Sequence, residues 1–250
     1  MKTAWDYSDL AQAYLKRPDY ADEALDRMLA RAALPPGARI CDVGAGVAHL
    51  TLALLARGFA VTAVEPNDEM RKRGIARTQG LADCTWFEGT GEATGQPSHA
   101  FEMVTFGSSF NVTDREATLR EVARIAKSRG WFACMWNHRN LDDPLQAQVE
   151  AIITRAIPSY AYGTRREDQT PVIVSSGLFE APIVVDGTIL HSVPAMDWVE
   201  AWRSHATLAR QAEAKRDAIV DEIAALLAAR KLRTLEVPYV TRIWLARLRD

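Results

Sequence analysis

Short apolar runs alternate with amphipathic stretches along the first half of the chain. The expected strands are 39–43, 60–65, 84–88, 101–106 and 131–136. The expected helices between them are 49–57, 68–79 and 114–126. Short apolar runs bounded by turn residues are typical of buried strands, and one-sided apolar periodicity is typical of surface helices. Strand–helix units of this length predict right-handed crossovers and a parallel sheet that helices cover on both faces.

The two ends of the chain are less regular. Residues 8–33 predict helix, interrupted at Arg17-Pro18 because proline disfavours helix at the preceding residue. The remaining expected elements are a helix at 144–156, a polar loop at 158–170, a strand at 184–193, helical structure over 196–230 and a strand at 237–245. No repeat or linker divides the chain. The sequence therefore predicts one doubly wound α/β domain, with a Rossmann-like, seven-stranded, mostly parallel sheet and helical lid elements.

Composition excludes several classes of partner. The chain has 250 residues, 48% hydrophobic and 25% charged, with a formal net charge of −2, as expected of an ordinary globular protein. Charges of both signs are spread along it, and arginines at 165–166 and 229–233 are expected on solvated faces, so we expect no nucleic-acid or membrane partner. Three separated cysteines without a CxxC predict buried thiols and no metal site. We expect a cytoplasmic monomer or homodimer without a signal peptide.

A glycine turn after the first expected strand is the main candidate for a ligand site. In the segment 41–50 (CDVGAGVAHL), Gly44 and Gly46 let the backbone turn tightly into a helix, so that a ligand can approach main-chain N–H groups. Glu65 closes the next strand, where an acidic side chain can accept both hydroxyls of a ribose. His49 stands where a dinucleotide fold requires glycine, which favours S-adenosylmethionine (SAM) over NAD or FAD. A glycine turn and a surface glutamate in an unrelated α/β protein remain the alternative.

From Ile40 to about Trp136 the chain resembles class I SAM-dependent methyltransferases, and within them the small-molecule branch that includes trans-aconitate-type enzymes. The matching segments follow one another in the expected order: 14–20, 42–46 (DVGAG), 64–70 (VEPNDEM), 89–94, 124–131 and 237–247. The departures are Ala48, where glycine is usual, and Ser128-Arg129, where Pro-Gly is usual. The resemblance implies an N-terminal helical lid over 1–34, a SAM-binding core over 35–140 and a C-terminal part over 141–250 that carries a substrate lid.

The resemblance also implies which residues hold the cofactor. The first glycine turn would contact the methionine part of SAM, Glu65 its ribose, and Met70 and the 91–92 segment its adenine. Arg17 would reach the SAM carboxylate, although an arginine before proline is also common at a solvated helix end. The implied cofactor-binding residues are Tyr14, Arg17, Asp42, Gly44, Ala45, Gly46, Glu65, Pro66, Met70, Gly91, Glu92 and Ser108.

The reaction site should lie beyond the carboxyl ends of the fourth and fifth strands. In the resembled branch the fourth strand is followed by a glutamine, a histidine and an aromatic residue, and here these positions hold Ser108, Asn111 and Val112. Asn111 can orient a substrate but cannot accept a proton at neutral pH, so the expected general base is missing. Asn137 and His138 follow the fifth strand, and His138 either replaces that base or lies on the surface.

Tyrosines are expected to cover the site. Tyr7 and Tyr162 lie in segments that should close over it, and aromatic faces attract a sulfonium cation, unless these rings are ordinary surface or core residues. The candidate catalytic residues are Asn111, Asn137, Tyr7, Tyr162 and His138.

Three functions fit these residues. The first is methyl transfer from SAM to a nitrogen or oxygen of a small molecule of specialised metabolism. The second is attack of the SAM amine on its own side chain, which releases methylthioadenosine and azetidine-2-carboxylate. The third is a non-catalytic SAM-binding module.

Overall fold

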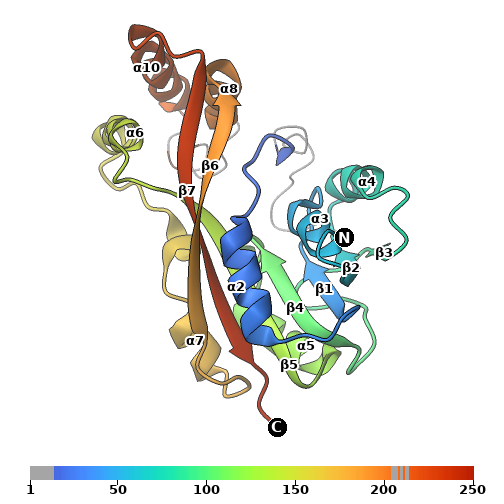
Figure 1. The fold of residues 1–250 in the computed structure, drawn as a ribbon. Helices are drawn as coiled ribbons and strands as arrows, with labels where there is room; N and C mark the ends of the chain where they lie inside the picture. Colours follow the sequence, from blue (N-terminus) through green and yellow to red (C-terminus); the bar gives the residue numbers. More distant parts are fainter. Residues whose placement is uncertain (1–13, 204–207, 209–210, 212–213) are drawn as a thin grey trace.

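A seven-stranded sheet forms the centre of the computed structural model, which describes residues 14–203, 208, 211 and 214–250 (Figure 1). Its strands are β1 (Arg39–Val43), β2 (Ala60–Val64), β3 (Cys84–Phe87), β4 (Phe101–Gly107), β5 (Ala126–Arg139), β6 (Ile183–Pro194) and β7 (Thr234–Arg247). They follow the order β3-β2-β1-β4-β5-β7-β6. The first five are mutually parallel, and β7 runs antiparallel between β5 and β6. The expected doubly wound, mostly parallel sheet is confirmed.

The helices occupy the connections that the apolar pattern indicates. They are α2 (Asp22–Ala32), α3 (His49–Leu55), α4 (Asp68–Arg77), α5 (Arg115–Ile125), α6 (Pro144–Ala156), α7 (Thr170–Ser175), α8 (Ala195–Arg203) and α10 (Arg216–Ala229), with short 3₁₀ turns η2 (Phe110–Val112) and η3 (Gly163–Arg166). Three begin at a side-chain cap, because the carboxylate or amide of Asn67, Asp114 and Asp143 accepts a backbone N–H in the first turn. The segment expected as a polar loop holds η3, and α7 begins at its end.

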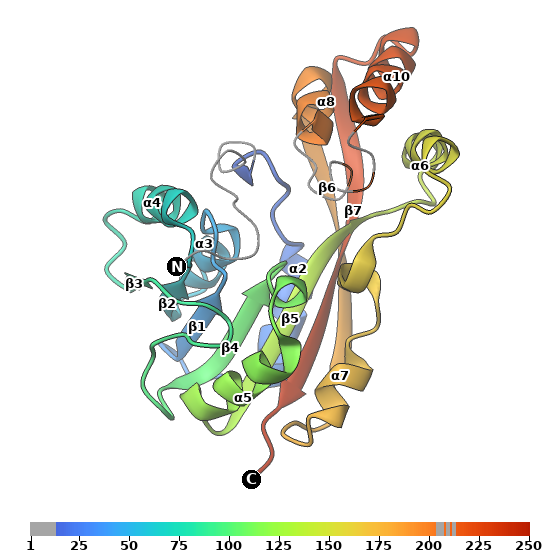
Figure 2. The same cartoon turned by 180° about the vertical axis from the view of Figure 1, so that it is seen from behind.

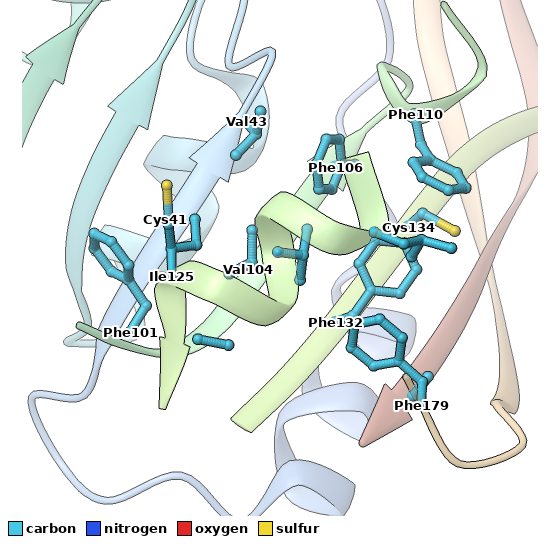
Figure 3. Close-up of a cluster of buried hydrophobic side chains, with 14 of the residues drawn as sticks. Cys41, Val43, Phe101, Val104, Phe106, Phe110, Ile125, Phe132, Cys134 and Phe179 are labelled. Atoms are coloured by element: carbon cyan, nitrogen blue, oxygen red, sulfur yellow. The ribbon is translucent and has the colours of Figure 1, made fainter. Parts of the chain in front are cut away.

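Helices cover both faces of the sheet, which explains the unbroken apolar runs in its strands. On one face α5 and α7 close over a cluster in which the rings of Phe106, Phe110 and Phe179 lie 5.2–5.7 Å from that of Phe132 (Figure 3). On the other face α2 and α3 pack against strand residues such as Met103. The helix expected as an N-terminal lid therefore differs in the structure: α2 lies on the sheet, because its apolar residues pack there.

The long strands β6 and β7 extend past the rest of the sheet and carry a second helical layer (Figures 1 and 2). There α6, α8 and α10 gather around their own apolar cluster, which includes Trp198 and Trp202. We call these three helices with the adjoining ends of β6 and β7 the lid lobe. Within the described ranges, no helix is long and apolar enough to cross a membrane.

Candidate functional site

A cavity of about 530 Å³ opens at the carboxyl ends of β1 and β4. The chain crosses from one side of β1 to the other between β3 and β4, and such switch points are where open α/β sheets bind ligands. One half of the cavity wall comes from the turns after β1, β2 and β4. The other half comes from residues 14–20, the segment after α6 and the lid lobe, including Trp198 and Trp202.

The turn after β1 is locked by backbone contacts that require glycine. The N–H groups of Gly44 and Ala45 donate to the Val64 carbonyl, at 2.8 and 3.1 Å. Gly44 has φ +69°, and a Cβ there would lie 2.4 Å from the Cβ of Ser109, whose hydroxyl donates to the Val43 carbonyl. A side chain at this position would therefore be strained and would also clash.

Glu65 lies at the end of β2 and faces the same turn. Its carboxylate is 7% exposed and accepts the backbone N–H groups of Gly46 and Asn67, both at 2.9 Å. Burial raises the pKa of Glu65, which these two bonds partly oppose. A carboxylate fixed in this way beside the cavity has the position expected for pairing with two vicinal hydroxyls.

Asp42 forms a buried acidic group behind the turn. Its carboxylate, 1% exposed, accepts the hydroxyls of Thr51 at 2.7 Å and Thr105 at 3.2 Å. Burial raises the pKa of Asp42 to about 6, against the effect of both hydroxyls. The group is thus mainly an anion at neutral pH, its side-chain hydrogen-bond partners are two neutral hydroxyls, and it borders the cavity.

Residues 14–20 are tied to the sheet edge by two polar side chains. The Asn137 amide donates to the carbonyls of Pro18 and Asp19, and its oxygen accepts the Thr241 hydroxyl at 2.5 Å. The His49 ring lies between the Asp19 carboxylate, at 2.7 Å, and the carbonyl of Tyr14, at 2.9 Å. Asn137 therefore positions this segment.

Beside that segment, Tyr20 meets the end of β4. Its hydroxyl lies 3.0 Å from the hydroxyl of Ser108, a non-glycine residue with φ +61°. Burial raises the pKa of Tyr20. Strained backbone of this kind is common where a fold presents side chains to a ligand.

The lid end of the cavity is aromatic and basic. Arg139 donates to Glu150 at 2.7 Å and to the Tyr162 hydroxyl at 3.0 Å, and its guanidinium lies 4.7 Å from the centre of the Trp202 ring. Tyr162 in turn donates to Glu150. Arg165 and Arg166 line the same end. The prediction that these two arginines form a solvated face is wrong, because η3 turns them toward the cavity.

All twelve residues implied for cofactor binding line this one cavity. Of the candidate catalytic residues, Asn137 and Tyr162 line it, whereas Asn111 and His138 are not among its lining residues. Tyr7 lies outside the described residues. The Asn111 amide oxygen accepts the indole N–H of Trp136, at 2.9 Å, which gives it a structural partner instead.

The geometry does not support His138 as a general base. Burial and the nearby arginines lower its pKa to about 3, so the ring is a weak base at neutral pH. Its Nδ1 is buried without a hydrogen-bond partner among the described residues.

Sequence reasoning gave no role to several lining residues. Those missed include Tyr20, His49, Arg139, Trp198 and Tyr239. Arg139 could have been found, since it ends β5 two positions after Asn137. Nothing in the local sequence placed Trp198 and Tyr239 at the site, because they reach it only through the packing of the lid lobe.

Residues 41–134 match the family model described as a methyltransferase domain. An uncharacterized methyltransferase of Mycobacterium tuberculosis is 32% identical over 127 residues, which are 50% of this chain and 48% of that protein. The ubiquinone/menaquinone biosynthesis C-methyltransferase UbiE of Caulobacter vibrioides is 30% identical over 146 residues, 53% of this chain and 57% of that one. The matches thus span about half the length of these curated relatives.

Solved structures share the fold over most of the chain. YcgJ of Bacillus subtilis has a TM-score of 0.58 at 17% identity, covering 91% of this chain and 98% of that one. A Haemonchus contortus phosphoethanolamine N-methyltransferase 2 in complex with SAM has a TM-score of 0.55 at 12% identity, covering 96% and 56%. The solved structures thus show a methyltransferase-like fold, and the family model and the curated relatives are those of methyltransferases. The comparisons do not single out the trans-aconitate-type branch.

Proposed function

We propose that this protein is a SAM-dependent methyltransferase that acts on a nitrogen or oxygen of a small molecule of specialised metabolism, in the cytoplasm. The observation that carries the proposal is the fixed Glu65 carboxylate facing the glycine turn, in a cavity that continues to an aromatic lid end. The methyltransferase-domain match over 41–134 covers that turn and Glu65, which supports the same conclusion.

The residues present fit SAM. A Cβ on Gly46 would meet nothing nearer than a backbone oxygen at 4.0 Å, so the cradle beside Glu65 is open. Glu65 would hold the ribose hydroxyls, Met70 would pack against the adenine, and Asp42 would face the positively charged methionine end. When bound, SAM supplies a methyl group that its sulfonium activates.

The residues of the chain would act mainly by orientation and by excluding water. Methyl transfer from a good leaving group depends on aligning the acceptor with the methyl, and an aromatic lid end supports that alignment. Among the described lining residues, the imidazoles are those of His49 and His191. His49 is held by Asp19 and a backbone carbonyl, and burial lowers the pKa of His191. Transfer would therefore rely on position and not on a dedicated histidine base.

The test is to incubate the purified protein with SAM alone and with a panel of small amines, hydroxy acids and heterocycles, and to follow the adenosine products by mass spectrometry. S-adenosylhomocysteine that forms only with an acceptor would support the proposal. Methylthioadenosine from SAM alone, above the uncatalysed background, would contradict it and indicate cyclisation. Tight SAM binding without either product would indicate a binding module.

A control separates the site from contaminating activity. Glu65→Gln should abolish most of the turnover, whereas Glu69→Gln, an exposed change on α4 outside the cavity lining, should not alter it. Equal turnover in both variants would show that another protein or another site makes the product.

A further inference from the structure

The lid end of the cavity carries more positive charge than its acidic residues neutralise. The basic lining residues, histidines apart, are Lys16, Arg17, Arg139, Arg165 and Arg166. Two of them have acidic partners, since Lys16 pairs with Asp197 at 2.8 Å and Arg139 with Glu150 at 2.7 Å. No ion pair within the described ranges involves the other three arginines.

Arg165 and Arg166 are also left with unused hydrogen-bond donors. The Nε atoms of both are buried and have no hydrogen-bond partner among the described residues. The Arg166 guanidinium lies 3.6 Å from the centre of the Tyr162 ring, which fixes its plane without engaging its N–H groups. Burial and the charges of Arg17 and Arg166 lower the pKa of Arg165. Adjacent buried donors of like charge are unfavourable unless an anion joins them.

The cofactor itself does not balance these charges. SAM has a single carboxylate, which Arg17 is expected to take, and its sulfonium and ammonium make it a net cation. With its carboxylate at Arg17 and its ammonium facing Asp42, bound SAM would leave Arg165 and Arg166 without an anionic partner. A second ligand with a negative group would complement both the arginines and the cofactor.

We propose that Arg165 and Arg166 form a subsite for an anionic group, a carboxylate or a phosphate, on the acceptor substrate. The subsite rests on the proposed function only in assigning this anion to a methyl acceptor. Because Tyr162, Trp198 and Trp202 line the same cavity, the acceptor is a planar or aromatic acid.

The test uses three probes of matched shape: benzoate, phenyl phosphate and the neutral benzamide. Their binding to the full-length protein is measured by ligand-observed NMR and calorimetry, with and without S-adenosylhomocysteine. We expect benzoate or phenyl phosphate to bind at least about tenfold more tightly than benzamide, as charge-assisted hydrogen bonds require. Which of the two anions binds better distinguishes a carboxylate from a phosphate substrate.

Variants identify the residues responsible. Arg165→Gln and Arg166→Gln should each remove most of the preference for the anion, and Arg165→Lys should retain part of it. The control Arg120→Gln, at an exposed site on α5, should retain the whole preference. Equal affinity for benzoate and benzamide, or an unchanged preference in the double glutamine variant, would overturn the subsite. If the glutamine variants unfold, the salt dependence of the wild type provides the test. Added salt screens charge interactions, so benzoate affinity that is the same in about 50 and 500 mM KCl would also overturn the subsite.

The two proposals fail separately. If the wild-type protein does not bind S-adenosylhomocysteine in a direct binding measurement, the methyltransferase assignment is rejected. Arginine-dependent anion binding without the cofactor would still support the subsite. Conversely, normal cofactor binding without anion preference would reject the subsite alone.

Discussion

Replacing Asp42 by asparagine should stabilise the protein at neutral pH while weakening its hold on the cofactor. The Asp42 side chain is buried beside the cavity, and its carboxylate accepts the neutral hydroxyl groups of Thr51 and Thr105. Asparagine has nearly the same shape and can keep hydrogen bonds to both hydroxyls, but it carries no charge. The cost of burying a charge is therefore absent in the variant.

The size and sign of the effect follow from the pKa of Asp42. Burial raises it from the ordinary value of 3.8 to about 6. The folded state therefore binds a proton more readily than the unfolded state, so this group's contribution to stability is lost as the pH rises from about 4 to about 6. At about 1.4 kcal/mol per pKa unit, the ionised form opposes folding by up to about 3 kcal/mol at pH 7.5.

Chemical denaturation of the wild type and of Asp42→Asn from pH 4 to pH 8 measures this contribution. The difference between the two curves isolates Asp42 from the other carboxyl groups. We expect Asp42→Asn to gain up to about 3 kcal/mol at pH 7.5 and little at pH 4, with Asp83→Asn, an exposed loop change, showing neither effect. S-adenosylhomocysteine should bind Asp42→Asn about tenfold more weakly, because its ammonium group loses a charge partner. A variant that is less stable than the wild type at pH 7.5, or a difference independent of pH, would refute this reasoning.

Three further changes test the site and the core. Glu65→Gln should weaken S-adenosylhomocysteine binding by about tenfold or more in calorimetry, because the ribose hydroxyls lose their charge-assisted hydrogen bonds. Glu69→Gln should change the affinity by no more than about twofold, and equal affinities of the two variants would contradict the ribose role. Gly44→Ala should lower the free energy of unfolding by more than Gly37→Ala. Both glycines have φ +69°, but only at Gly44 would the added Cβ clash with a side chain, 2.4 Å from the Cβ of Ser109. Equal losses, near the roughly 1–2 kcal/mol of backbone strain alone, would exclude the clash. Phe132→Ala should cost about 3–5 kcal/mol in urea denaturation, and a loss below about 1 kcal/mol would show that the ring cluster is not tightly packed.

The sheet and the cofactor half of the cavity could be predicted because their signals are local. Strands β1, β2 and β4 of the parallel region are mainly apolar and buried, and the turn after β1 needs glycine at a position that a single Cβ would block. Glu65 follows from the same logic, since adjacent parallel strands end at one edge. The local pattern thus placed the glycine turn and Glu65, whereas the other residues implied for the cofactor came from the family resemblance.

The acceptor half could not be predicted because it depends on contacts between distant segments. Arg165 and Arg166 lie in a polar stretch whose composition is compatible with a solvated loop and with the turn η3, and does not distinguish between them. Only the approach of η3 to the sheet edge, where the Thr164 hydroxyl reaches the Asn111 carbonyl at 3.5 Å, turns these arginines toward the cavity. The prediction for His138 failed for a related reason, because burial, and after it the charges of those arginines, lower the pKa of its ring.

This division has a consequence for substrate assignment. The methyltransferase-domain match ends at residue 134, and it includes the glycine turn and Glu65. Arg139, the two η3 arginines and the tryptophans of α8 all come from later segments. Relatives that share the matched region therefore have a reason to share a cofactor but none to share an acceptor. The acceptor has to be inferred from the charge and shape of the lid end. There the two η3 arginines, which have no acidic partner among the described residues, favour an anionic planar ligand over a neutral one.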